Sequence, residues 1–303
     1  MQRTFDHELT LTLKPKNNSN ELFFNHSEKI LKEIEDHIEE KYKDQILLTK
    51  FEKTGIEYFT QKIEDNENFT FVKYGDGELL CMLGAKGENC DFHPYSERLS
   101  KLLQISFATL LSKSQIFLAD WKDNLIDARD SFISMYNLKP KFADYDCFLS
   151  IKDNMKTDKL LNFYSLIKNT SRKKIFIGPE KLSGVIEMLE MDQHIKVPFV
   201  NAFSEYDQIK RQLVQTIEDD AIYIYCCSMM SCVLINDLVN LNSNITNLDV
   251  GSGFDAIFSE KSRPKQPSKE KAHSYYKTIL PENLFRKKID IAKSILSKRT
   301  GPY

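Results

Sequence analysis

The segment TFVKYGDGELLCMLG at 70–84 contains two acidic residues, Asp76 and Glu78, with one residue between them. Each of them follows a glycine. The β-branched and aromatic residues before them predict a strand that ends near Asp76. In extended or turning backbone, residues two apart point the same way, so both carboxylates could bind one Mg²⁺ or Mn²⁺ ion. The alternative is a polar turn whose acids are only solvated.

The segment KYGDGEL is similar to the R-F/Y-G-D-G-E signature of the GT-D-type glycosyltransferases, formerly a domain of unknown function. The stretches 90–104 and 221–258 also resemble that family, so the likeness covers about residues 65–258. It implies a Rossmann-like transferase that uses a nucleotide sugar and binds its divalent metal through Asp76 and Glu78. Lys73 stands where the family more often has arginine; it keeps the positive charge but lacks the planar guanidinium that binds a phosphate through two N–H groups. Ser252 stands where the family pattern has a histidine.

The elements around these residues alternate between strands and helices, which predicts a mainly parallel sheet. Strands are expected at 70–74, 115–119, 174–177, 197–200, 221–226 and 246–250. Helical patterns lie around 95–112, 122–136, 156–168, 181–190, 204–217 and 229–240. The predicted fold class is α/β, with a Rossmann-like, mainly parallel sheet, helices on both faces, and helical extensions at both termini. Ligands of such sheets bind beyond the carboxyl ends of the strands.

The candidate substrate-binding residues all lie at predicted strand ends: Lys73, Gly75, Gly77, Gly178, Ser228, Met229 and Asp249. At Ser228 and Met229 a strand gives way to a helix, whose free N–H groups and dipole could bind a pyrophosphate. The GPEKLSG turn at 178–184 offers Glu180 and Lys181 to a ligand. The alternative is an ordinary turn with Pro179 at the first helical position.

An inverting transfer also needs a group that takes the proton of the acceptor hydroxyl. The sequence offers Asp255, Glu180, Asp249 and His93 for this role. Asp255 and Glu180 are the predicted catalytic residues, with Asp255 preferred because it follows a predicted strand at the expected rim of the sheet.

The segment NLDVGSGFD at 247–255 has a second interpretation, because it resembles the glycine-rich first motif of S-adenosylmethionine-dependent methyltransferases. Asp255 occupies the third glycine position of that motif, and only about fifty residues follow, too few to complete a doubly wound domain. A circularly permuted methyltransferase is therefore the alternative enzyme, and a non-catalytic nucleotide-binding interaction protein is the alternative outside enzymes.

Composition and length set the remaining expectations. The 303 residues carry a formal net charge of −2, which gives no electrostatic reason to expect nucleic acid as a partner. Six cysteines without a C-x-x-C pair, and an N-terminus with charges in place of an apolar signal core, predict a reduced, cytoplasmic protein.

Three regions are expected along the chain. Residues 1–64 form an N-terminal arm and amphipathic helices, 65–260 the nucleotide-sugar-binding catalytic domain, and 261–303 a basic loop followed by an amphipathic helix. The N-terminal helices could mediate a homodimer, and the C-terminal helix could rest on the inner membrane face near a lipid-linked acceptor. The basic loop is either a solvated linker or a lid that stacks Tyr275 and Tyr276 on the ligand.

The combined prediction is a metal-dependent glycosyltransferase of the hexosyltransferase class. It would move a sugar from a nucleoside-diphosphate sugar to a hydroxyl of a glycan or lipid-linked glycan, with Mn²⁺ or Mg²⁺ stabilising the departing diphosphate.

Overall fold

The computed structural model describes residues 54–121, 125–259 and 265–281. The chain divides into two compact units, Met1–Glu52 and Lys53–Tyr303, of which the first lies outside the described residues. The amphipathic helices expected before residue 54 and the basic helix expected at 282–300 also lie outside them. The homodimer and membrane contacts assigned to these segments therefore stay predictions.

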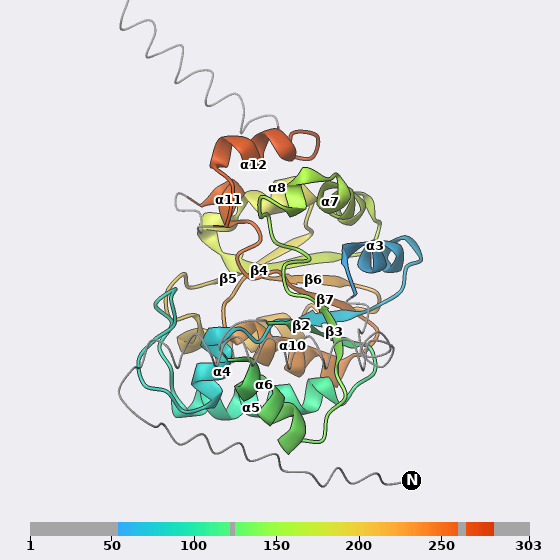
Figure 1. The fold of residues 1–303 in the computed structure, drawn as a ribbon. Helices are drawn as coiled ribbons and strands as arrows, with labels where there is room; N and C mark the ends of the chain where they lie inside the picture. The colour runs from blue at the N-terminus through green and yellow to red at the C-terminus, as the bar shows by residue number, and fades with distance from the viewer. Residues whose placement is uncertain (1–53, 122–124, 260–264, 282–303) are drawn as a thin grey trace, which may run out of the picture. The chain divides into compact units, whose positions relative to one another are not determined.

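Within the described residues, seven strands form one sheet in which every pairing is parallel (Figure 1). The spatial order is β3-β2-β1-β7-β6-β4-β5. The strands are β1 (Thr70–Val72), β2 (Ile116–Asp120), β3 (Lys141–Asp144), β4 (Lys174–Pro179), β5 (Gln193–Val197), β6 (Ile222–Tyr225) and β7 (Thr246–Asp249). The predicted α/β class with a Rossmann-like parallel sheet is confirmed.

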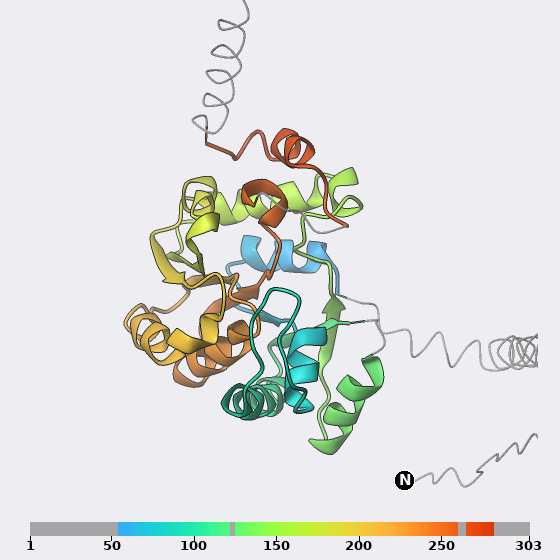
Figure 2. The same cartoon turned by 90° about the vertical axis from the view of Figure 1, so that its left-hand side faces the viewer.

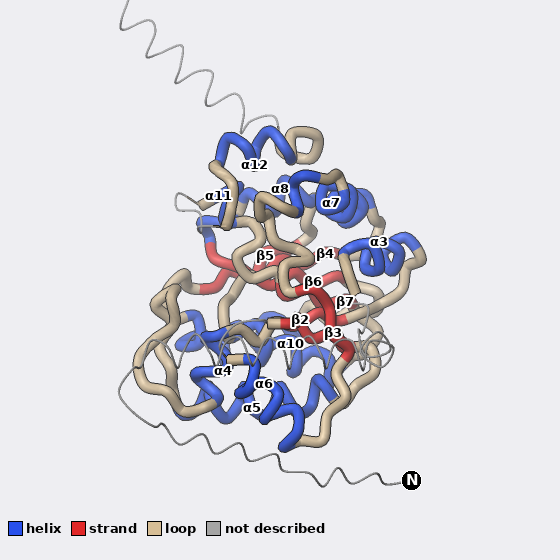
Figure 3. The backbone as a smooth tube through the Cα atoms, viewed as in Figure 1, coloured by secondary structure: helices blue, strands red, loops and turns tan. Residues whose placement is uncertain are grey.

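Helices cover both faces of the sheet, which lies between two helical layers (Figure 3). One face carries α4 (Asp76–Met82), α5 (Glu97–Leu111), α6 (Ile126–Met135), α9 (Tyr206–Val214) and α10 (Met230–Leu241). The other carries α3 (Ile56–Glu64), α7 (Lys159–Asn169), α8 (Gly184–Leu189), α11 (Asp255–Phe258) and α12 (Lys269–Tyr275). Three short 3₁₀ helices, η1 (Asn154–Lys156), η2 (Glu180–Leu182) and η3 (Ala202–Glu205), lie in the connections.

The alternation of side chains along each strand builds two hydrophobic cores. In β6, Tyr223 and Tyr225 face the core beneath α10, whereas Ile222 and Ile224 face the core beneath α7 and α8. Because both faces are covered, the strand is apolar throughout, as parallel sheets require.

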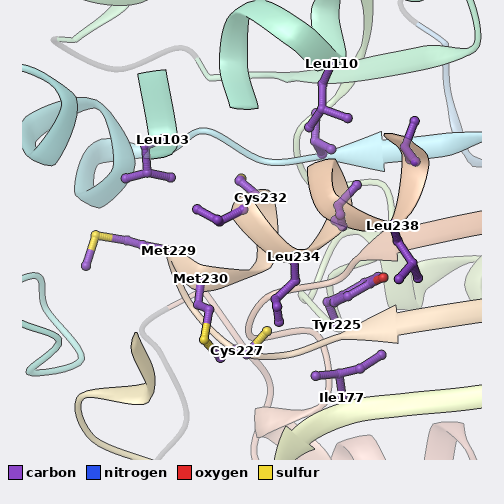
Figure 4. Packing of buried hydrophobic residues seen from close by; sticks show 14 of the residues in the cluster. Leu103, Leu110, Ile177, Tyr225, Cys227, Met229, Met230, Cys232, Leu234 and Leu238 are labelled. Carbon is purple, nitrogen blue, oxygen red and sulfur yellow. The ribbon is translucent and has the colours of Figure 1, made fainter. Parts of the chain in front are cut away.

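Helix α10 contributes many of the buried residues in the hydrophobic core of its layer (Figure 4). Its residues Leu234 and Leu238 are fully buried against the strands, in the same cluster as Leu103 of α5. Burying each such leucine contributes roughly 1.5–3 kcal/mol. The packing fixes where α10 begins, and therefore where the β6–α10 turn meets the edge of the sheet.

The two edge strands are where the sequence-based assignment is wrong. The apolar stretch 197–200 was expected to be a strand, but β5 runs from Gln193 to Val197, and Phe199 and Val200 are exposed. Strand β3 was not predicted at all. Edge strands have one unpaired side and tolerate exposed polar residues, so their sequences lack the apolar run of a central strand.

Segments assigned to the two extensions also enter the core. Phe59 of α3 is fully buried against Phe69, Phe71 and Phe148. Tyr276, next to α12, is fully buried with its hydroxyl 2.8 Å from Ser150 Oγ. The expectation that Tyr276 stacks on a ligand is therefore wrong, because its ring belongs to the core.

Tyr275 is held in a similar way at the surface of the same layer. Its hydroxyl donates to the carbonyl of Thr157 at 2.6 Å and accepts the Leu161 N–H at 3.1 Å. The lid function expected of Tyr275 is therefore not supported by its contacts, which anchor it to the start of α7.

Two further observations concern the chemistry of the chain. None of the six cysteines, all of which the structure describes, forms a disulfide. In the described parts of the chain, no helix combines the length and apolar character needed to cross a membrane.

Candidate active site

A topological switch point lies between β1 and β7, at the middle of the sheet. After β1 the chain enters α4 on one face, and after β7 it enters α11 on the other face. Such a point opens a crevice beyond the strand ends, where open α/β sheets bind their ligands. A pocket with an empty volume of about 900 Å³, its open mouth included, lies there. Figure 2 looks from this side, with the teal loop after α4 at the centre of the view.

Asp76 and Glu78 both line this pocket from the first turn of α4. The Glu78 carboxylate folds back and accepts the Gly75 N–H at 2.9 Å, which caps the helix. Because α4 begins at Asp76, the two side chains leave a helix and not extended backbone, and residues two apart on a helix do not face each other. The expected extended geometry is therefore wrong for this pair.

Asp249, the last residue of β7, brings a third carboxylate to the pocket and is only 4% exposed. Burial raises the pKa of Asp249 to about 7, although the Lys73 ammonium and the Gly251 N–H, 3.2 Å from Oδ1, act in the opposite direction. Burial also raises the pKa of Glu78 to about 7, with the Asp249 carboxylate as the next cause. Two acids from neighbouring strands therefore share one electrostatic environment.

Lys73 supplies the positive charge beside this pair. Its side chain is buried, and its ammonium lies 4.1 Å from the centroid of the Tyr145 ring. The backbone of Gly251 is in the left-handed region, with φ +51°, and a Cβ there would lie 3.6 Å from Lys73 Nζ. A glycine at this turn therefore lets the chain reverse tightly next to the lysine.

The loop between α4 and α5 forms one wall of the pocket. Asn89 Nδ2 donates to Ser228 Oγ at 2.9 Å, and Asn89 Oδ1 accepts the backbone N–H groups of Asp91 and His93, each at 3.0 Å. A Cβ on Gly77 would lie 3.1 Å from the Asn89 Cβ. Gly77 thus lets this loop approach the start of α4 closely.

The opposite wall comes from the ends of β4 and β5. The Lys181 ammonium lies 3.6 Å from the centroid of the Phe199 ring. His93 reaches this wall from the loop, because its Nδ1 accepts the Ala202 N–H at 3.2 Å. Burial lowers the pKa of His93.

Three of these lining residues were not expected from the sequence, namely Asn89, Tyr145 and Phe199. No local motif marks Asn89, Tyr145 or Phe199. Of the two ligand contacts expected in the GPEKLSG turn, Lys181 lines the pocket and Glu180 does not.

Of the predicted site residues, the pocket is lined by Lys73, Asp76, Gly77, Glu78, Ser228, Asp249 and Asp255. Ser228 has φ +54°, a left-handed conformation at the turn into α10. Asp255 begins α11 on the other side of the switch point from Asp76. The structure therefore brings together residues from all four strand ends selected from the sequence, with Pro179 and Lys181 coming from the end of β4.

Four predicted residues do not line the pocket. Gly75 is buried behind it, and a Cβ on Gly178 would lie 2.4 Å from the Phe176 ring, so this glycine serves core packing. Met229 lies in the hydrophobic core (Figure 4). Glu180 is exposed and pairs with Lys196 at 2.8 Å, which also lowers the Glu180 pKa.

The acidic residues of the pocket suit a metal ion that is shared with substrate phosphates, and not one that is held by protein ligands alone. Among the described residues, no group of three or more His, Cys, Asp or Glu side chains is arranged to hold a metal ion. A closed site made only of protein ligands is therefore not built here. Mg²⁺ bound with a substrate's phosphates needs only one or two carboxylates and keeps several waters. Asp76 and Glu78 both line the pocket, so a cation shared with substrate phosphates would take a carboxylate from one or both of them.

The protein resembles solved structures in its fold, whereas its sequence alone matches no known family model. No family model and no curated protein matches the sequence. Two similar solved structures are the highly conserved domain of unknown function 1792, described as having a distinct glycosyltransferase fold, and a selenomethionine-substituted structure of DUF1792. They are 18% and 16% identical to this chain, and each comparison has a TM-score of 0.50 and covers 76% of this chain and 90% of the other. The fold expected from the GT-D resemblance is confirmed.

Proposed function

We propose that the protein is a metal-dependent glycosyltransferase of the hexosyltransferase class. It transfers a sugar from a nucleoside-diphosphate sugar to a hydroxyl of a glycan or lipid-linked glycan. The observation that carries this proposal is the polar pocket at the switch point, where Lys73, Glu78 and Asp249 meet in a fold similar to one described as a glycosyltransferase fold.

The donor's diphosphate is assigned to the part of the pocket next to Lys73 and the turn into α10. The Lys73 ammonium offers a charge, and α10, a helix of 12 residues, directs its free N–H groups and positive dipole end toward the same turn. A divalent cation, Mn²⁺ or Mg²⁺, held by Asp76 and Glu78 would supply Lewis-acid stabilisation of the charge on the departing diphosphate.

The acceptor hydroxyl needs a base on a different loop, and Asp255 is the assigned residue. It lines the pocket from the first turn of α11, across the switch point from Asp76. Glu180 is not used, because it lies outside the pocket. Asp249 is buried beside Lys73 and is better placed to orient the lysine than to meet an acceptor.

A thermal-shift and calorimetric screen tests this function. Uridine, guanosine, thymidine and cytidine diphosphate sugars are titrated with and without Mn²⁺, and the donor should raise the melting temperature only when the metal is present. Asp76→Asn and Glu78→Gln should each abolish the Mn²⁺-dependent rise in melting temperature while leaving the fold intact. Asp255→Asn should keep donor binding and lose transfer.

The control is Asp207→Asn, which removes an exposed carboxylate paired with Arg98 outside the pocket. It should bind the donor like the wild type. If no nucleotide sugar binds, or if Asp76→Asn and Glu78→Gln both keep full metal-dependent turnover, the proposal is wrong. A parallel titration with S-adenosylmethionine tests the methyltransferase alternative, which requires binding near Asp249.

A further inference from the structure

The β4–β5 end of the pocket carries a lysine that no acidic side chain neutralises within the described residues. Lys181, in η2, lines the pocket, and the contact that the structure gives its ammonium is the face of the Phe199 ring at 3.6 Å. The adjacent Glu180 does not serve as its counter-ion, because that carboxylate binds Lys196. A cation–π contact orients an ammonium but leaves its charge available to a ligand.

His93 adds a hydrogen-bond donor at the same end. Its Nδ1 accepts the backbone N–H of Ala202, so Nδ1 carries no proton. The neutral ring must then hold its proton on Nε2, which is the nitrogen left for a ligand in the pocket. Burial and the Lys181 ammonium lower the pKa of His93, against the opposing effect of Asp91, so the neutral form is favoured. This tautomer makes His93 a donor and unsuited to act as a general base.

This end is separate from the place assigned to the cation and diphosphate. In the sheet, β4 lies three positions from β1 and two from β7. With neighbouring strands about 4.8 Å apart, the end of β4 is roughly 14 Å from that of β1 and roughly 10 Å from that of β7. The backbone that carries Lys181 is therefore displaced along the sheet from the backbone that carries Asp76 and Asp249.

We infer that Lys181 and the Nε2–H of His93 form an anion subsite that binds a carboxylate or phosphate group of the substrate. The inference rests on the proposed function in assigning that group to a sugar or glycan, and it narrows the substrate class to one that carries a negative charge at a distance from the reacting diphosphate. The charged groups that act on His93 are the Asp91 carboxylate and the Lys181 ammonium.

Calorimetric titration of the full chain tests the subsite without requiring sugar transfer. The two probes are inorganic phosphate, which represents a single phosphate group, and glucuronate, which represents a sugar carboxylate. Lys181→Met should weaken binding of at least one probe about tenfold, the loss expected for one charge-assisted contact. Lys181→Arg should restore most of that affinity, because it keeps the charge and the stacking on Phe199.

Two variants of His93 separate its role as a hydrogen-bond donor to the ligand from its structural contact with the Ala202 N–H. In His93→Asn, the amide oxygen can replace Nδ1 as acceptor of the Ala202 N–H, but the Nε2–H donor is lost. In His93→Gln, the amide nitrogen can replace Nε2–H. The Gln variant should therefore bind the affected probe more tightly than the Asn variant. In ¹⁵N-labelled wild type, the signal assigned to His93 should show the Nε2–H tautomer and should shift when the probe is added.

Lys196→Met is the matched control, because Lys196 is an exposed lysine on β5 that is paired with Glu180 outside the pocket. It should leave both affinities unchanged. The subsite is wrong if neither probe binds the wild type, or if Lys181→Met binds both probes like the wild type. Loss of nucleotide-sugar binding alone, with probe binding intact, would refute the proposed function and leave the subsite standing.

Discussion

Glu78, in the first turn of α4, and Asp249, at the end of β7, line one pocket beyond two neighbouring strands. Burial raises the pKa of Glu78, and the Asp249 carboxylate is the next cause. The two residues come from opposite ends of the catalytic region and meet because β7 pairs directly with β1. Because the two carboxyl groups lie close together, their titration can be measured before the substrate of the pocket is identified.

The first prediction concerns stability as a function of pH. Because the folded-state pKa of Glu78 is raised above its unfolded value of about 4.5, the folded state binds more protons, and stability falls as pH rises from about 4.5 to 7. Glu78→Gln keeps an oxygen to cap the Gly75 N–H and removes the charge. Its melting temperature should exceed that of the wild type by at least about 3 °C at pH 8, and the difference should vanish below pH 4.5. A constant difference at all pH values would contradict the assigned electrostatic cause.

The second prediction concerns Lys73, whose ammonium acts to lower the pKa of Asp249. Replacing it with methionine keeps much of the side-chain volume and removes the charge. The titration midpoint of the Asp249 carboxyl, followed by ¹³C NMR, should therefore rise above its wild-type value of about 7. Lys73→Arg should keep the midpoint close to that value. An unchanged midpoint in the methionine variant would show that Lys73 does not interact with Asp249.

The third prediction concerns a buried arginine near the amino ends of the strands, outside the pocket. Arg172 is 9% exposed and donates to the Asp220 carbonyl at 2.5 Å, to Thr246 Oγ1 at 2.8 Å and to Asn68 Oδ1. Arg172→Met leaves these acceptors without their buried donor and should lower the free energy of unfolding by about 2–4 kcal/mol, measured by urea denaturation.

The matched control for Arg172 is Arg98, whose ion pair with Asp207 is exposed on both sides. Arg98→Met should leave the urea midpoint nearly unchanged, because water screens exposed ion pairs. If the two variants lost the same stability, burial would not be the reason for the effect at Arg172.

The fourth prediction concerns the turn that carries Asp255. A Cβ on Gly253 would lie 2.9 Å from the Phe148 carbonyl oxygen and 3.1 Å from that of Val250, and backbone atoms cannot move aside without shifting the turn. Gly253→Ser should cost at least about 2 kcal/mol of unfolding free energy and should reduce transfer activity.

Gly55→Ser is the same change at a site with room to adjust. There the Cβ would meet only the flexible carboxylate of Glu57, at 3.0 Å, and serine is a favoured residue at the N-cap of a helix. Its urea midpoint should be unchanged or slightly higher. Equal losses in both variants would mean that the crowding at Gly253 is not what limits substitution.

The central strands and most helices of the catalytic region were predictable because their signals are local. The runs IFI at 175–177 and AIYIYC at 221–226 consist of aliphatic and aromatic residues and cysteine, since both faces of these strands are covered. The edge strands β3 and β5 carry exposed residues and gave no such signal. The two-residue spacing of Asp76 and Glu78 was visible, but their helical setting was not, because a glycine before an acid is compatible with either a turn or a helix start.

The sequence by itself determined the α/β class and the strand-end loops where chemistry had to be sought, since alternating elements and parallel strands place their carboxyl ends at one edge. Only the tertiary structure decided which of those loops meet. Strand order depends on long-range packing between the two helical layers, and it brought Glu78 next to Asp249 and His93 next to Ala202, while it left Glu180 outside the pocket and Met229 in the core. Local spacing cannot encode such contacts, because each depends on where a distant segment packs.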